Sequence, residues 1–193
     1  MKLNTLLLCA LLGMSGQALA QDASQQNHPN EFATGGLFFW ENNLNTIGVG
    51  LRHSYQRTLT DRLRLVTALS FIQSIPDWQI DAGYSTQSGL VAEVGAGVSP
   101  FSEQGRFEIG VSGAYRYGGE AYEARTVERT SEGQVFLVAD VGTEVISQVG
   151  YSIIASYRLP IGERFVARTA VQVYGFNYFG ELITPSVQVG YRF

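Results

Sequence analysis

Three segments of this chain alternate apolar residues with small or polar residues at almost every step. Segment 187–193, Val-Gln-Val-Gly-Tyr-Arg-Phe, puts valine, tyrosine and phenylalanine on one face and glutamine, glycine and arginine on the other. Segments 107–117 and 149–158 repeat the pattern. Successive side chains of a strand point to opposite faces, whereas a helix would mix these charged and apolar residues. The alternation therefore predicts an all-β chain.

Turn-rich segments divide the rest of the chain into further strands. Working back from the last one, we expect strands near 182–193, 164–176, 148–159, 105–117, 87–99, 61–73 and 45–58. When the N-terminus and the C-terminus of a bacterial membrane barrel lie on the same side of the membrane, the number of strands is even. Segment 33–40, with Phe38-Phe39-Trp40, supplies the eighth. The prediction is a closed antiparallel up-and-down transmembrane β-barrel.

The connections alternate between short turns and longer loops, as in outer-membrane barrels. The longest lies near 118–147 and contains Val135-Phe136-Leu137-Val138, which itself resembles a strand. We interpret 120–145 as an external hairpin that extends two strands above the membrane. A ten-stranded barrel is the alternative, because the even-number rule does not say which even number applies.

Alternation alone does not say which face points inward, because soluble and membrane barrels use opposite faces. The charged residues of the strands share a face with glycines, which suits a narrow lumen. Aromatic residues gather near strand ends, as in the two girdles of a membrane barrel. The expected girdle residues are Tyr55, Phe101, Phe107, Tyr117, Tyr157, Phe165, Tyr174, Phe176 and Tyr191.

The predicted lumen residues form a network of charges. They are Arg52, Arg64, Glu93, Glu108, Arg158 and Arg168. The strand directions place Arg52, Glu93 and Arg168 towards mid-height and the other three nearer the periplasmic end. Because an isolated buried charge is costly, these groups must pair or be hydrated. We expect a water-containing network that plugs the lumen and leaves no open pore.

The first twenty residues have the pattern of a secretory signal peptide. Lys2 precedes an apolar run over 3–14, and Ala18-Leu19-Ala20 fits the small-residue cleavage rule. The run is too short to span a bilayer as a helix. We expect cleavage before Gln21, a flexible periplasmic tail over 21–32 and a barrel over 33–193. Cleavage removes Cys9, the single cysteine.

The last strand looks like the C-terminal signal that the barrel-assembly machinery recognises. Its apolar and aromatic positions are Val187, Val189, Tyr191 and Phe193. Over 33–193 the chain resembles the small outer-membrane β-barrel superfamily, of the eight-stranded OmpA-like and OmpX-like type. This resemblance implies location in the outer membrane of a Gram-negative cell. The implied partners are outer-membrane lipids, lipopolysaccharide and the barrel-assembly machinery during biogenesis.

The residues indicate no catalytic, cofactor or metal site. The net charge of -4 lacks the basic footprint of a nucleic-acid binder. The two histidines are His28, in the tail, and His53, which is adjacent to Ser54 and so faces the opposite way in a strand. No phosphate-binding glycine loop is present.

We therefore expect a monomeric, non-enzymatic envelope barrel with a structural or loop-mediated interaction role. A narrow small-solute channel and a lipid A-modifying barrel enzyme are the alternatives.

Overall fold

The computed structural model describes residues 29–42, 46–60, 62–75, 85–100, 106–131, 134–177 and 179–193. The expected signal peptide and most of the expected tail lie outside these residues. The described part contains no helix that is long and apolar enough to cross a bilayer.

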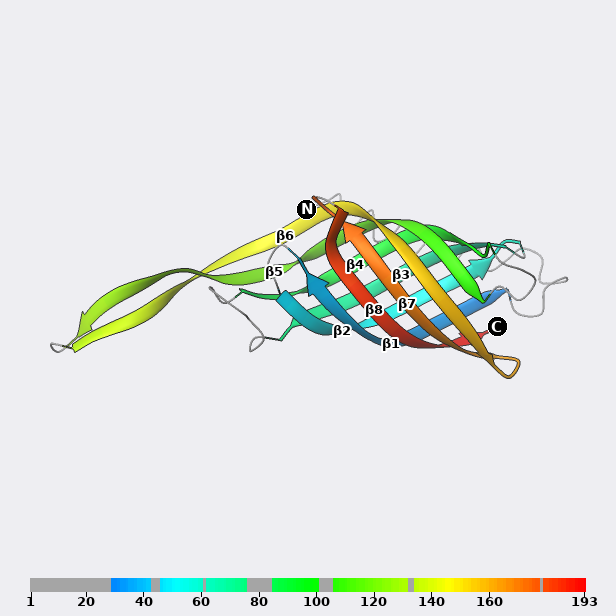
Figure 1. Ribbon diagram of the computed structural model, residues 1–193, viewed down its shortest axis with the longest axis horizontal. Coiled ribbons are helices and arrows are strands. Elements are labelled where there is room, and N and C mark those ends of the chain that lie inside the picture. Colours follow the sequence, from blue (N-terminus) through cyan, green and yellow to red (C-terminus); the bar gives the residue numbers. More distant parts are fainter. Residues whose placement is uncertain are drawn as a thin grey trace.

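Eight antiparallel strands form a closed barrel (Figure 1). They are β1 (Asn30–Glu41), β2 (Thr46–Thr58), β3 (Leu63–Ser74), β4 (Ser85–Val98), β5 (Phe107–Ser131), β6 (Gln134–Ile161), β7 (Phe165–Gly175) and β8 (Phe179–Arg192). Each strand pairs with its neighbours in the chain, and β1 pairs with β8 to close the ring. The predicted fold class is confirmed, and the ten-stranded alternative is wrong.

The first strand is longer than expected. It begins at Asn30, three residues before the predicted start of the barrel at Ala33. Asn30 pairs with Arg57 of β2, and Glu31 pairs with Arg192 of β8. The end of the segment expected to be a flexible tail is therefore part of the barrel wall.

Strands β5 and β6 extend far beyond the other six as a two-stranded ribbon (Figure 1). Their pairing runs from Phe107↔Tyr157 to Ser131↔Gln134, with one register irregularity between Glu123 and Arg125. The segment Val135–Val138 is thus part of β6 and adds no ninth strand. We call the barrel end with the ribbon the hairpin end. The opposite end, with the turn of Gly162 (φ 71°) between β6 and β7, is the turn end.

Apolar side chains cover the outside of the barrel, and polar ones fill the inside. Val111 and Val189 are 61% and 55% exposed, whereas Glu93 and Arg168 are 4% and 2% exposed. A soluble barrel would have the reverse arrangement. The predicted membrane-type orientation is confirmed.

Two of the expected girdle aromatics point inward instead. Tyr174 is 1% exposed and Phe176 packs against the interior, with the two rings stacked at 5.8 Å between centroids. Tyr117, Tyr157, Phe165 and Tyr191 do point outward. The girdle prediction was wrong for Tyr174 because it followed position near a strand end and ignored parity: Tyr174 shares its face with Arg168 and Gln172. Phe101 lies outside the described residues.

A layered lumen as the candidate functional site

All six predicted lumen residues point into the barrel. Their exposed fractions are at most 7%, for Arg52, Arg64, Glu93, Glu108, Arg158 and Arg168. They come from β2 to β7, and each lies on the face that period-two alternation assigns to it. What alternation does not give is which residue meets which across the lumen.

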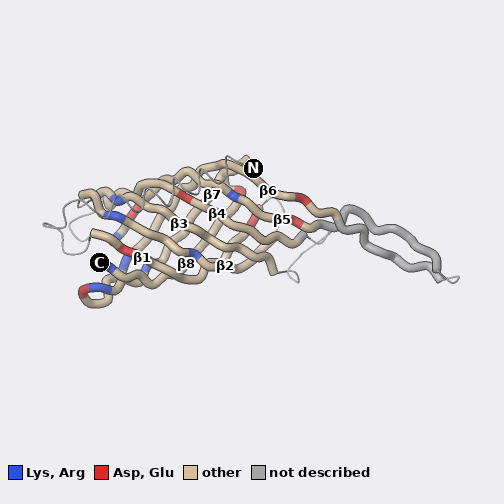
Figure 2. Tube along the Cα trace, turned by 180° about the vertical axis from the view of Figure 1, so that it is seen from behind, with Lys and Arg blue, Asp and Glu red and all other residues tan. Residues whose placement is uncertain are grey.

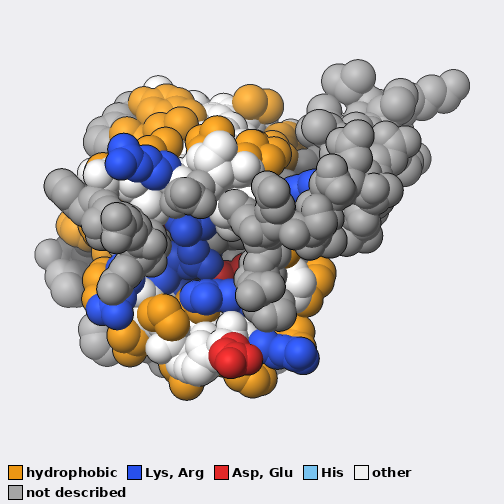
Figure 3. Space-filling view, turned by 90° about the vertical axis from the view of Figure 1, so that its right-hand side faces the viewer, with side chains coloured by type: hydrophobic (Ala, Val, Ile, Leu, Met, Phe, Trp, Pro, Cys, Tyr) orange, Lys and Arg blue, Asp and Glu red, His pale blue; other side chains and the backbone are white. Residues whose placement is uncertain are grey.

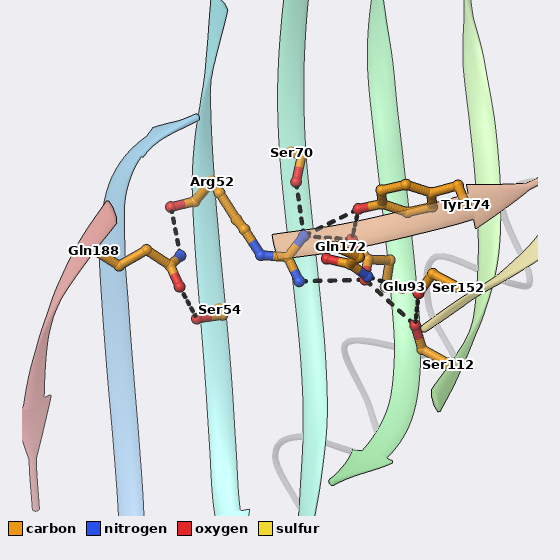
Figure 4. Close-up of polar contacts among 9 residues, drawn as sticks. All are labelled: Arg52, Ser54, Ser70, Glu93, Ser112, Ser152, Gln172, Tyr174 and Gln188. Atoms are coloured by element: carbon orange, nitrogen blue, oxygen red, sulfur yellow. Dashed lines mark hydrogen bonds and ion pairs between the residues drawn. The ribbon is translucent and has the colours of Figure 1, made fainter. Parts of the chain in front are cut away.

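Arg52 of β2 and Glu93 of β4 form the centre of the lumen (Figure 4). Nη1 of Arg52 lies 2.5 Å from Oε1 of Glu93, and Nη2 lies 3.2 Å from Oε2. This two-armed arrangement is the strongest form of arginine–carboxylate pairing. The pair is electrically neutral, so it meets the requirement that buried charges be compensated.

Further donors from other strands complete the coordination of Glu93. The hydroxyl of Tyr174 donates to Oε1 at 2.6 Å, and the amide of Gln172 donates to Oε2 at 2.5 Å. Ser112 adds a third donor at 3.3 Å. Every neutral donor lowers the cost of keeping this carboxylate away from water.

The Arg52–Glu93 pair also ties the barrel wall together. Arg52 donates to Ser70 of β3 at 3.1 Å, and its main-chain carbonyl accepts from Gln188 of β8 at 3.3 Å. We call this set the central cluster. Its members are Arg52, Ser54, Ser70, Glu93, Ser112, Ser152, Gln172, Tyr174 and Gln188, from seven of the eight strands (Figure 4).

A second group, the turn-end cluster, contains Glu31, Arg64, Glu108, Arg158, Arg168 and Arg192. Arg64 donates to Glu108 at 2.9 Å and to Ser99 at 2.8 Å. Glu31 forms a short ion pair with Arg158. Arg168 and Arg192 lie 3.9 Å and 3.7 Å from the two oxygens of Glu31, beyond hydrogen-bond distance.

The side chain of Arg168 does not lie at mid-height in the lumen, where the sequence analysis expected it. It is the register partner of Arg158, and its one ion pair among the described residues is with Glu31. It therefore belongs to the turn-end cluster. The tilt of barrel strands shifts the height of inward residues from strand to strand, which a count along the chain does not capture.

The third group, the hairpin-end cluster, was missed by the sequence analysis. Arg116 of β5 contacts both oxygens of Glu41, at 3.1 Å and 2.9 Å, and it also donates to Gln87. The guanidinium lies 5.8 Å from the centre of the Phe176 ring, a cation–π distance. Glu31 and Glu41 were missed because the first strand was predicted over 33–40 only. The inward face of this strand continues from Ala33 back to Glu31 and from Phe39 on to Glu41.

An apolar layer separates the central and hairpin-end clusters. Its members are Leu37, Phe39, Ile72, Val91, Ala114, Leu182 and the ring of Tyr174, whose hydroxyl belongs to the central cluster. On β4, Val91 lies between Gln87 and Glu93, and on β5, Ala114 lies between Ser112 and Arg116. The interior is thus a stack of polar, apolar and polar layers, where the sequence predicted a charged network alone.

Val187, Val189 and Tyr191 of the proposed assembly signal lie on the outside of β8, and exposed Phe193 follows the last residue of that strand. Val187 and Val189 are more than half exposed, and Tyr191 packs between the rings of Phe165 and Phe193. Asn30 and Phe193 exchange main-chain hydrogen bonds of 3.2 Å and 3.0 Å across the β1–β8 seam. These residues thus form both the closing seam and part of the outer surface.

His53 lies on the outer surface, as its parity predicts. Its ring stacks on Phe32 and its Nδ1 lies 3.0 Å from Oγ1 of Thr34. Ser54 points inward and is 2% exposed. The two side chains are therefore on opposite sides of the wall. Among the described residues, no group of three or more His, Cys, Asp or Glu side chains is arranged to hold a metal ion.

The sequence matches no protein-family model and no curated protein. The structure is similar to that of Ail, the attachment invasion locus protein of Yersinia pestis. The TM-score is 0.56 at 11% identity, over 87% of this chain and 100% of that one. Ail in complex with the heparin analogue sucrose octasulfate gives 0.54 at 12% identity, over 85% and 97%. Neisserial surface protein A gives 0.46 at 8% identity, over 86% and 96%. The likeness to Ail, together with the eight strands observed, shows that the chain has the fold of the small eight-stranded outer-membrane barrels.

Proposed function

We propose that this chain is an outer-membrane protein whose β5–β6 ribbon binds a partner protein at the cell surface, with the barrel as a closed anchor. The observation that carries the proposal is that the ribbon continues after pairing with both flanking strands has ended. The last pair of β4 with β5 is Ser85↔Tyr122, and the first pair of β6 with β7 is Tyr151↔Gly175.

Within the described residues, one edge of β6 over 134–150 therefore has no neighbouring strand. An unpaired edge offers main-chain donors and acceptors to a strand of another protein. An apolar side chain beside this edge adds contact area, since Val145 is 67% exposed. These are the features that strand addition uses: main-chain bonds for affinity and alternate side chains for specificity.

The barrel itself supports the anchor role. Its apolar outer belt suits a lipid bilayer, and the export pattern of residues 1–20 suits the outer membrane. The central cluster and the apolar layer obstruct the lumen, which argues against the channel alternative. His53 and Ser54 lie on opposite sides of the wall, which argues against a hydrolytic pair. Attachment, the role in the name of Ail, is compatible with this proposal.

Removal of the ribbon tests the proposal. Tyr122 and Gly142 are register partners, so an Asn-Gly turn in place of 123–141 closes β5 and β6 without changing the barrel register. The same variant carries Val145→Ser, because this exposed side chain stays on the unpaired edge after the trim. We expect cells with the trimmed protein to keep a heat-modifiable barrel and to lose attachment to protein-coated surfaces. Full attachment by the trimmed strain would contradict the proposal.

Site-specific photo-crosslinking identifies the partner. A crosslinking residue at position 145, whose register partner Gly119 lies beyond the girdle residue Tyr117, is expected to give protein adducts in intact cells. The same residue at position 111, on the lipid-facing surface, is the matched control and should give none. Equal adducts from both positions would show that capture is unspecific.

A further inference from the structure

Positive charge is concentrated at the turn end of the barrel. In Figure 2, the positions of basic residues along the Cα trace gather at the end that carries the C-terminus, whereas acidic positions predominate towards the ribbon. The described arginines of the turn end are Arg57, Arg62, Arg64, Arg106, Arg158, Arg164, Arg168 and Arg192. The described acidic residues there are Glu31, Glu108 and Glu163. Figure 3, which looks into this end, shows basic side chains within its central hollow.

This hollow contains a polar cavity of about 130 Å³. Three guanidinium groups line it, from Arg64, Arg158 and Arg192, and Glu31 is the one carboxylate on its wall among the described residues. The side chains of Arg64 and Arg158 are each 9% exposed, and that of Arg192 is 25% exposed. The cavity is thus accessible from the mouth, but its walls are largely removed from water.

The arginines of this cavity have donors that no described residue accepts. Among the described residues, the buried Nε groups of Arg64, Arg158 and Arg192 have no hydrogen-bond partner. Beside the cavity, Arg168 is 2% exposed, and no described residue accepts from its Nε or Nη2. Buried donors without acceptors are rare in native proteins and call for a ligand or ordered water.

The charges of the turn-end cluster do not cancel. Glu31 and Glu108 offset two of the four guanidinium groups of Arg64, Arg158, Arg168 and Arg192, which leaves a surplus of positive charge. By contrast, the central cluster balances one arginine with one glutamate. Water satisfies a donor but does not neutralise a charge, so a surplus in a sheltered cavity favours an anion.

We propose that the turn-end cavity binds a phosphate group, held by Arg64, Arg158 and Arg192. Arg168, whose Nη2 lies 3.9 Å from Glu31, adds positive potential at this site. The planar guanidinium groups suit the oxygens of a tetrahedral oxyanion, each through two parallel donors. The cavity has room for one such group with water. The phosphate comes either from free inorganic phosphate or from the headgroup of a phospholipid at the rim.

Inorganic phosphate is the probe for the first experiment. The folded full-length barrel, in a phosphate-free detergent, is titrated with phosphate by calorimetry at constant ionic strength, with chloride as the reference anion. We expect phosphate to bind and to raise the melting temperature, and chloride to do neither. An equal response to both anions would overturn the proposal.

Arg192→Gln removes the buried Nε donor of Arg192, which has no hydrogen-bond partner among the described residues. We expect about a tenfold weaker phosphate affinity, the usual effect of losing one charge-assisted hydrogen bond. Arg168→Gln should also weaken binding. The matched control is Arg106→Gln, which removes an exposed arginine at the same end and should bind as the wild type does. An equal loss of phosphate affinity in Arg106→Gln would show that the arginines act only through their general charge, and it would refute the site. If a lumen variant fails to fold, the wild-type comparison of anions still decides.

Native mass spectrometry separates the two sources of phosphate. Phospholipid that stays bound after extraction, and is displaced by inorganic phosphate, would assign the cavity to a lipid headgroup. Phosphate binding without retained lipid would assign it to the free anion. Neither result depends on the ribbon, so failure of this proposal leaves the proposed attachment function untouched.

Discussion

Arg52 and Glu93, which are 41 residues apart in the chain, meet across the lumen through two hydrogen bonds of 2.5 Å and 3.2 Å, with both side chains at most 4% exposed. Glu93 also accepts from Tyr174, Gln172 and Ser112. One carboxylate thus connects four strands, β2, β4, β5 and β7.

Glu93→Ala tests the energetic weight of this contact. Removing the carboxylate leaves Arg52 buried without its counter-charge, so we expect a loss of roughly 3 kcal/mol in the free energy of unfolding. Urea unfolding of the barrel in lipid vesicles measures it. The control is Glu163→Ala, in the exposed turn between β6 and β7, which should change stability by at most about 0.5 kcal/mol. A similarly small change for Glu93→Ala would show that the central cluster does not hold the barrel together.

Val111→Arg tests the lipid-facing assignment. Val111 is 61% exposed on the outside of β5, so an arginine there should cost about 2–4 kcal/mol near the bilayer midplane. Val145→Arg is the matched control. Its register partner Gly119 lies eight residues further along β5, about 26 Å, so this arginine reaches water and should cost little. Equal costs for both variants, again by urea unfolding in vesicles, would place Val111 outside the membrane.

Gly48→Ala tests the packing of the apolar layer. Gly48 is the register partner of Phe39, and a Cβ on Gly48 would overlap the Phe39 ring and the carbonyl oxygen of Gln73. We expect a loss of about 1–3 kcal/mol from overpacking. Gly36→Ala is the control, because a Cβ on Gly36 meets no atom within 4 Å. Thermal unfolding should separate the two variants, and a neutral Gly48→Ala would mean that the ring shifts freely.

Phe193→Ala tests the proposed assembly signal. Phe193 stacks on Tyr191 beside the β1–β8 seam, so its loss should lower the amount of folded barrel in outer-membrane fractions. Phe165→Ala removes a comparably exposed ring that also packs on Tyr191. Heat-modifiable mobility on gels quantifies assembly. If both variants assemble equally well, Phe193 is an ordinary surface aromatic and the signal is not there.

The sequence by itself determined the all-β barrel class, the approximate limits of most strands and the face of most side chains, whereas the choice between eight and ten strands came from the structure. The reason is local, because successive side chains of a strand point to opposite faces. The faces of Arg52, Glu93 and Val111 can therefore be predicted from the few residues around each of them. The inward-or-outward choice followed from the narrow lumen, which favours glycines beside the charged residues.

Only the tertiary structure decided which inward residues meet. Partners across a lumen depend on the tilt and stagger of all eight strands, a property of the closed ring that no single segment contains. Arg168 therefore contacts Glu31 of the first strand, and Tyr174 turns from an expected girdle residue into a donor to Glu93. The same closure leaves the turn-end arginines with more charge than their glutamates balance, because side chains from distant segments share one narrow interior.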